Sequence, residues 1–247
     1  MSTKIDASPT IEWGSGDKTL VFLHYFGGAA QSWQWVAQHL TNYRCVALNL
    51  PGFGGTPAPE QPSLQGYAHA VSQELTRLGI ENYTLIGHSM GGKIALQVAT
   101  GDSPPQQVVL IAPSPPTQEP MPDEEKERLL NNHPSQDNAE TTVKSSTQKP
   151  LSDEQHTLAI KTHTIVADSA WRWWLREGMN HSIAEQMPQL QMPITVIASK
   201  DDPVIPYNAI HSEVLGILPH AKLIATEGVG HLIPLEAADW VAAQLRV

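Results

Sequence analysis

Short apolar runs recur along the chain, and the segments between them carry apolar residues at helical spacing. Each run is continuously apolar instead of alternating with polar residues, which is typical of strands buried on both faces of a parallel sheet. The predicted strands are residues 19–24, 45–50, 83–88, 107–112, 194–199 and 222–226.

The intervening segments predict helices over residues 30–40, 64–79 and 92–100. Within 64–79, for example, apolar side chains fall at Tyr67, Val71, Leu75 and Leu78. Strands that alternate with helices indicate an α/β fold with a mostly parallel, doubly wound sheet and helices on both faces. Right-handed crossovers follow from this arrangement.

This alternation stops between residues 113 and 187. A proline-rich stretch is followed by a polar stretch and then by helical residues that include three tryptophans. Because no buried strand occurs there, we expect a helical cap insertion over 113–187. Residues 1–112 and 188–247 would then form one core, interrupted by the cap.

Composition narrows the choice of partners. The formal net charge is −10, and no cluster of Lys and Arg is evident, which argues against nucleic acid or an anionic membrane surface as a partner. No signal peptide and no apolar run of about 18 residues is visible. Cys45 is the only cysteine and lies in a predicted strand, where a core thiol is expected. We therefore expect a cytoplasmic monomer or homodimer.

Three residues point to nucleophilic catalysis. Ser89 stands in a Gly-x-Ser-x-Gly motif between a predicted strand and a predicted helix, as a strained nucleophile turn requires. His231 and Asp202 each follow a later strand, and in a parallel sheet the carboxyl ends of the strands meet at one edge. A histidine base and an orienting acid are what a serine nucleophile needs. The neighbouring Asp201 is the alternative acid.

An oxyanion must also be stabilised in such a site. The backbone N–H of Met90, directly after the serine, is one expected donor. The second donor is expected from the loop after the first main strand, where Gly27 and Gly28 suit an exposed backbone. Metal or cofactor chemistry is not indicated, because the histidines show no metal-ligand spacing and the Gly-rich segments at 14–19 and 51–57 lack a complete phosphate-binding pattern.

Five stretches resemble the α/β-hydrolase-fold serine hydrolases of the small bacterial esterase type. They are "FLHYFGG", "LPGFGGT", "GHSMGG", "ASKDDPVIP" and "GVGHLIPLE". The resemblance implies that Phe26 supplies the second oxyanion N–H, that Tyr25 replaces a usual glycine, and that Asp202, four residues before Pro206, is the acid. It also places Asn49 where relatives often have a structural aspartate.

The resemblance implies cleavage of a carboxylic ester with a small or medium acyl group through an acyl-enzyme, without a cofactor. Tyr25, Trp171 and Trp174 are the expected substrate contacts, and His24 and His88 the expected scaffold. A lactonase, a carbon–carbon bond hydrolase, a perhydrolase, a hydroxynitrile-type lyase and a ligand receptor that retains the triad remain alternatives, because the same three residues serve all of them.

Overall fold

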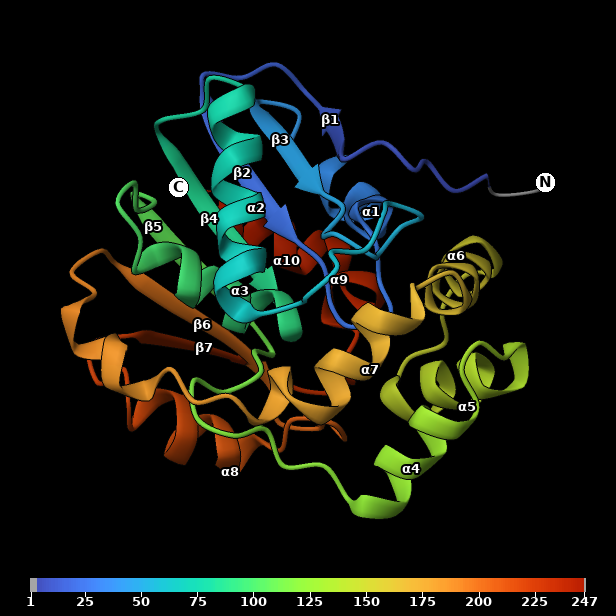
Figure 1. The fold of residues 1–247 in the computed structure, drawn as a ribbon. Helices are drawn as coiled ribbons and strands as arrows, with labels where there is room; N and C mark the ends of the chain where they lie inside the picture. Colours follow the sequence, from blue (N-terminus) through green and yellow to red (C-terminus); the bar gives the residue numbers. More distant parts are fainter. Residues whose placement is uncertain (1–3, 247) are drawn as a thin grey trace.

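The strands form one seven-stranded sheet in the part of the chain that the structure describes, residues 4–246 of a computed structural model (Figure 1). The order across the sheet is β1-β3-β2-β4-β5-β6-β7, and only β1 runs antiparallel to its neighbour. The strands are β1 (Thr10–Trp13), β2 (Lys18–Leu23), β3 (Tyr43–Leu48), β4 (Tyr83–His88), β5 (Gln107–Ile111), β6 (Ile194–Ser199) and β7 (Lys222–Thr226).

The sheet confirms the predicted fold class. Six strands lie within two residues of their predicted bounds, whereas the short edge strand β1 was not predicted. Side chains alternate between two cores, as a pleated strand requires: in β2, Val21 and Leu23 face one side while Leu20 and Phe22 face the other. Both faces of the sheet are therefore buried under helices.

Helices α2 (Leu64–Arg77) and α3 (Met90–Ala99) pack together on one face, and α1 (Gln34–Ala37) and α10 (Ala238–Leu245) on the other (Figure 1). Residues 30–40, predicted as one helix, form a 3-10 turn at Ala30–Trp33 followed by the short α1. Two further helical segments lie in the C-terminal part of the core: α8 (Tyr207–Ala209), which continues as a π-helix to Leu215, and α9 (Ile233–Glu236).

Four helices occupy the chain between β5 and β6, at the positions predicted for a cap. They are α4 (Asp123–Asn131), α5 (Gln136–Ser146), α6 (Asp153–Thr164) and α7 (Asp168–Arg176). The side chains of Ser135 and Ser152 cap the N-termini of α5 and α6. Figure 1 shows α4 to α7 beside the carboxyl ends of the strands, where they cover one edge of the sheet.

The hydrogen bonds of Asn49 explain why an asparagine suits this position better than an aspartate. Its Oδ1 accepts a hydrogen bond from Ala30 N (2.8 Å), and its Nδ2 donates to the carbonyls of Asp6 and Ser8. An aspartate could not donate those two bonds, so the amide ties the N-terminal segment to the core. Within residues 4–246, no helix has the length and apolar character needed to cross a membrane.

Candidate active site

Ser89 sits on a strained turn between β4 and α3. Its backbone has φ 53° and ψ −119°, a conformation that side-chain-bearing residues rarely adopt. Its N–H donates to Ile111 O (3.0 Å), and its carbonyl accepts from Gly92 N (2.8 Å). A Cβ at Gly91 would lie 2.6 Å from the carbonyl oxygen of His24. The flanking glycines therefore permit the close backbone approach that holds Ser89 in this turn.

The structure brings the three predicted residues together by direct hydrogen bonds. His231 Nε2 lies 2.9 Å from Ser89 Oγ, and His231 Nδ1 lies 2.9 Å from Asp202 Oδ2. All three side chains are buried, with 5–7% of each residue exposed. The carboxylate keeps the proton on Nδ1, which leaves Nε2 free to accept the serine proton.

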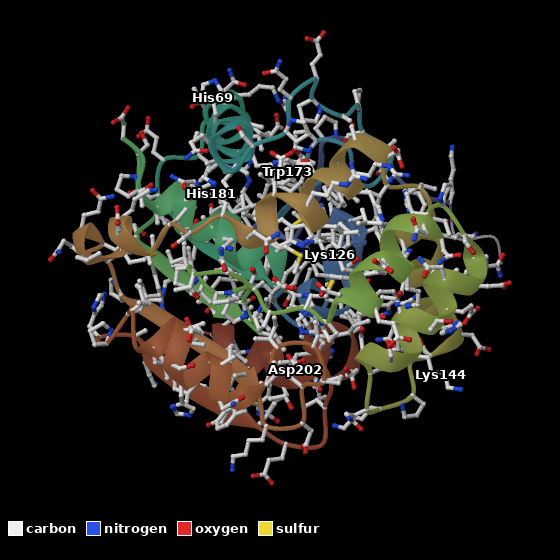
Figure 2. All side chains as sticks on the ribbon, turned by 60° about the horizontal axis from the view of Figure 1, so that its bottom comes forward. His69, Lys126, Lys144, Trp173, His181 and Asp202 are labelled. Carbon is white, nitrogen blue, oxygen red and sulfur yellow. The ribbon has the colours of Figure 1, made fainter. Side chains whose placement is uncertain are left out.

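The adjacent aspartates have different surroundings. The second oxygen of Asp202, Oδ1, accepts from the backbone N–H groups of Val204 (2.8 Å) and Ile205 (3.0 Å), which fix the carboxylate toward His231. Asp201 is exposed and instead accepts from Gly228 N (2.6 Å). Asp202 is thus the aspartate that contacts the histidine. Figure 2 shows it on the C-terminal part of the core, whereas the labelled Lys126 and Lys144 belong to α4 and α5 of the cap.

Neighbouring charges set the basicity of His231. Burial alone would lower the pKa of the imidazole, but the charge of Asp202 and its hydrogen bond outweigh burial, with smaller contributions from Glu119 and Glu236. The pKa of His231 is therefore raised above its ordinary value, which suits a base that accepts and returns a proton.

The loop after β2 begins beside the Ser89 turn, because a Cβ at Gly91 would lie 2.6 Å from the carbonyl oxygens of Leu23 and His24. Gly28 N donates to Tyr25 O (2.9 Å), and Gly27 has φ 84°, so Phe26 lies in a tight turn that needs glycine. Met90 is the first residue of α3, where backbone N–H groups carry no partner within the helix. Because β2 and β4 are neighbours at the point where the strand order reverses, these two loops face each other.

Two buried histidines support these loops. His24 donates from Nδ1 to Tyr25 O (2.8 Å) and accepts from Leu50 N at Nε2 (3.2 Å); burial lowers its pKa to about 4. His88 donates from Nε2 to the carbonyl oxygen of His231 (2.9 Å), and burial places its pKa well below the ordinary value. Both are neutral and hold backbone in place, in agreement with the predicted scaffold role.

A cavity of about 450 Å³ opens above Ser89 and His231, between core and cap. Tyr25, Phe26 and Trp174 line it. The ring of Tyr25 is buried and packs in one apolar cluster with residues of α5 and α6, and burial raises the pKa of its phenol to about 12. The cavity is concave and largely apolar, as small-molecule sites usually are.

The prediction that Trp171 contacts substrate is wrong: in the described part of the chain it does not line the cavity. Its indole stacks behind Phe26 at 4.2 Å between ring centroids, and its Nε1 donates to Leu129 O (2.9 Å). Trp173 turns the other way, toward α2, where its ring lies 5.0 Å from that of Tyr67. Only Trp174 of the three faces the cavity.

A family model described as the alpha/beta hydrolase family matches residues 20–244. The chain belongs to this family. The matched residues contain Ser89, Asp202 and His231 together with helices α4 to α7, whereas β1 and the first two residues of β2 lie before the match.

Two relatives match part of the chain in sequence. The chain is 38% identical over 101 residues to the dihydrolipoyllysine-residue acetyltransferase component of the acetoin cleaving system of Cupriavidus necator, covering 40% of this chain and 26% of that protein. It is 33% identical over 85 residues to the 2-succinyl-6-hydroxy-2,4-cyclohexadiene-1-carboxylate synthase of Escherichia fergusonii, covering 34% of each. The match thus spans about a third or less of either relative.

Solved structures share the fold across nearly the whole chain. The esterase EaEST from Exiguobacterium antarcticum superposes with a TM-score of 0.84 at 18% identity, covering 96% of this chain and 92% of that one. The meta-cleavage product hydrolase CumD from Pseudomonas fluorescens gives a TM-score of 0.80 at 20% identity, covering 96% and 91%. At these identities the likeness establishes the fold alone.

Sequence reasoning missed two polar residues of the cavity, Glu119 and His163. Glu119 lies in the proline-rich stretch after β5, and His163 near the C-terminal end of α6. Burial raises the pKa of Glu119 and lowers that of His163 to about 3. Neither stands in a sequence motif, so only the three-dimensional structure reveals that both line the same cavity as Ser89.

Proposed function

We propose that the protein is a serine hydrolase that cleaves carboxylic esters with small to medium acyl groups through an acyl-enzyme intermediate. The observation that carries the proposal is the continuous hydrogen-bonded series Ser89, His231 and Asp202, of which Ser89 and His231 line a largely apolar cavity. No cofactor takes part in the proposed reaction.

The first half-reaction forms the acyl-enzyme. Ser89 Oγ attacks the ester carbonyl carbon while its proton moves to His231 Nε2, 2.9 Å away. Asp202 stabilises the resulting imidazolium, and the backbone N–H groups of Met90 and Phe26 hold the oxyanion. The tetrahedral intermediate collapses, the bond to the alcohol oxygen breaks, and His231 returns its proton to that oxygen.

The second half-reaction restores the serine. Water attacks the acyl carbon, and His231 Nε2 accepts one of its protons. Collapse of this intermediate breaks the bond to Ser89 Oγ, which takes the proton back from His231, and the carboxylic acid leaves. The size of the cavity, whose lining includes Tyr25 and Trp174, would then select the acyl group.

A second candidate is cleavage of a carbon–carbon bond or elimination at the same serine. It is favoured by the 33% identity to a 2-succinyl-6-hydroxy-2,4-cyclohexadiene-1-carboxylate synthase, although that match covers only 34% of either chain. Cationic side chains that would bind a polyanionic substrate of that kind are missing from the described cavity lining. Ester hydrolysis therefore suits this cavity better.

Hydrolysis of p-nitrophenyl acetate, butyrate and octanoate tests the proposal. The intact protein should turn over the two shorter esters, and Ser89→Ala should lower kcat by at least about 10⁴-fold for each. A screen of lactones, cyanohydrins and vinylogous 1,5-diketones addresses the other candidates. Turnover of one of those compounds in the absence of any ester hydrolysis would replace the proposal.

A further inference from the structure

Aromatic rings of the cap pack against the loop that carries Phe26. The ring of Phe26 stacks on the indole of Trp171, with 4.2 Å between ring centroids and 29° between ring planes. The ring of Phe53, from the core, meets Phe26 edge-on at 6.3 Å. Phe26 belongs to the loop after β2 and Trp171 to α7, so the stacked pair joins the cap to this loop.

A second cap residue contacts the next position of the same loop. His163, at the end of α6, lies so close to Gly27 that a Cβ there would be 3.0 Å from His163 Cδ2. The rings of His163 and Trp171 also meet edge-on, with 4.7 Å between centroids. Two cap helices, α6 and α7, therefore meet at the turn that contains Phe26 and Gly27.

Trp171 is itself held by other residues of the cap. The ring of His133 stacks on its indole at 4.2 Å with only 9° between planes, and Trp171 Nε1 donates to Leu129 O (2.9 Å). Trp171 is fully buried, and in the described part of the chain it does not line the cavity. It can therefore influence the reaction only through the residues that it contacts.

The backbone N–H of Phe26 is the second expected oxyanion donor. Among the described residues, neither this N–H nor that of Met90 donates a hydrogen bond to a backbone carbonyl. Donors of this kind act only when they are held in place before the oxyanion forms. A displacement of about 1 Å can lower a rate by about 100-fold. What holds the ring of Phe26 therefore bears on the rate of the chemical steps.

We propose that Trp171 is a positioning residue, which holds the N–H of Phe26 in place for the oxyanion by stacking on the Phe26 ring. This inference rests on the proposed ester hydrolysis. It makes the cap a contributor to kcat as well as to substrate binding. Both half-reactions pass through an oxyanion, so a displaced donor slows acylation and deacylation alike.

Trp171→Leu and Trp173→Leu, assayed with p-nitrophenyl butyrate, test the proposal. Trp173 is the matched control, because it is another buried tryptophan of α7 but packs on Tyr67 of α2. Trp171→Leu should lower kcat by about 10- to 100-fold and leave KM within about threefold of the native value. Trp173→Leu should leave kcat within about threefold. Trp171→Phe, which keeps a ring against Phe26, should lose less than Trp171→Leu.

A transition-state analogue separates positioning from a general loosening of the fold. Ser89 Oγ attacks the carbonyl carbon of 1,1,1-trifluoro-2-pentanone, its proton moves to His231, and the ketone oxygen becomes an oxyanion. The inhibition constant of this ketone should rise in Trp171→Leu in step with the fall in kcat/KM. In Trp173→Leu it should stay at the native value.

Phe26→Ala provides a second route to the same contact, because it keeps the backbone N–H and removes the ring. It should reproduce both losses, and combining it with Trp171→Leu should add little, since both changes break one contact. Phe26 is only partly buried, so this variant tests the proposal even if Trp171→Leu does not fold.

Four results would overturn the inference. They are equal kcat values in Trp171→Leu and Trp173→Leu, a higher KM without a lower kcat, a lower kcat without weaker binding of the trifluoromethyl ketone, and a native kcat in Phe26→Ala. Each is measured against an active native protein, so each leaves the proposed hydrolysis standing. If the native protein shows no Ser89-dependent turnover, the proposed hydrolysis fails and this inference fails with it.

Discussion

At the scale of single residues, two adjacent aspartates differ in what they contact. Asp202 is buried and bonds to His231, while Asp201 is exposed and bonds to the backbone of Gly228. Asp202 also accepts hydrogen bonds from two backbone N–H groups of its own loop, those of Val204 and Ile205. The same substitution, aspartate to asparagine, should therefore impair catalysis at position 202 but not at position 201.

Asp202→Asn should lower kcat/KM for p-nitrophenyl butyrate by about 10³- to 10⁴-fold, since an amide cannot hold the required tautomer of His231 or stabilise its cation. Asp201→Asn is the matched control and should stay within about twofold of the native value. The measurement is steady-state kinetics on folded variants. Equal effects of the two changes would contradict the assignment of the acid.

The pH profile reports on His231. Because only the neutral imidazole accepts the serine proton, kcat/KM should fall on the acid side as His231 becomes protonated. Its pKa is raised by Asp202, so the midpoint of this fall should lie above the ordinary value of 6.5. A midpoint at or below 6.5, measured with p-nitrophenyl butyrate in the native protein, would contradict a raised pKa of His231 and show that burial outweighs Asp202.

The sequence allowed the triad to be predicted because each member follows a strand that the apolar pattern marks. It did not allow Glu119 to be predicted, since the proline-rich segment has no periodicity and its path depends on contact with Met179. The cluster of tryptophans misled the prediction that Trp171 contacts substrate. Helical spacing does not tell which of three clustered tryptophans faces a cavity and which packs behind Phe26.

At the scale of elements, one carboxylate joins the cap to the histidine loop. Glu236 Oε2, at the end of α9, accepts from the backbone N–H groups of Gly230 (2.9 Å), Gln148 (2.8 Å) and Lys149 (2.8 Å). Beside it, His231 N donates to the carbonyl of Ser146 (2.7 Å). The C-terminal end of α5 is thereby fixed against the loop that carries the base.

Glu236→Gln should loosen this junction, because a neutral amide oxygen accepts more weakly than a carboxylate. Hydrogen exchange at the amides of Gln148 and Lys149 should become about tenfold faster. Glu227→Gln, which removes a surface pair with Lys200, is the control and should leave these amides unchanged. Unaltered exchange in the Glu236 variant would show that the cap is held by other contacts.

Strands and helices with a buried apolar face could be located well from the sequence, whereas exposed elements could not. The parallel strands are apolar on both sides, so their sequences are distinctive. β1 has four residues at the sheet edge and depends on pairing with β3. The first two cap helices, α4 and α5, lie in a stretch too polar for a periodic signal, although the capping serine Ser135 marks the start of α5.

At the scale of the whole molecule, buried neutral histidines make stability depend on pH. The folded-state pKa is about 4 for His24 and about 3 for His163, both lowered first by burial, against an ordinary value of 6.5. The unfolded chain therefore takes up these protons first. The stability that each histidine contributes is present above pH 6.5 and is lost as the pH falls below it.

Between pH 7.5 and pH 5, each of these histidines should lower the free energy of unfolding by about 2 kcal/mol. His163→Phe should remove its share of that loss, while His69→Phe on the exposed side of α2 should not. Urea unfolding at the two pH values provides the measurement. The same pH-dependent loss in His163→Phe as in the native protein would contradict the prediction.

The central claim is that Ser89 is the nucleophile of a hydrolase, and a fluorophosphonate probe tests it most directly. Attack by Ser89 Oγ forms a bond to phosphorus and releases fluoride, and peptide mass spectrometry locates the adduct. We predict a single adduct on the peptide containing Ser89, loss of p-nitrophenyl butyrate turnover in step with labelling, and neither event in Ser89→Ala. An unlabelled Ser89, or an adduct elsewhere that abolishes turnover, would contradict the account.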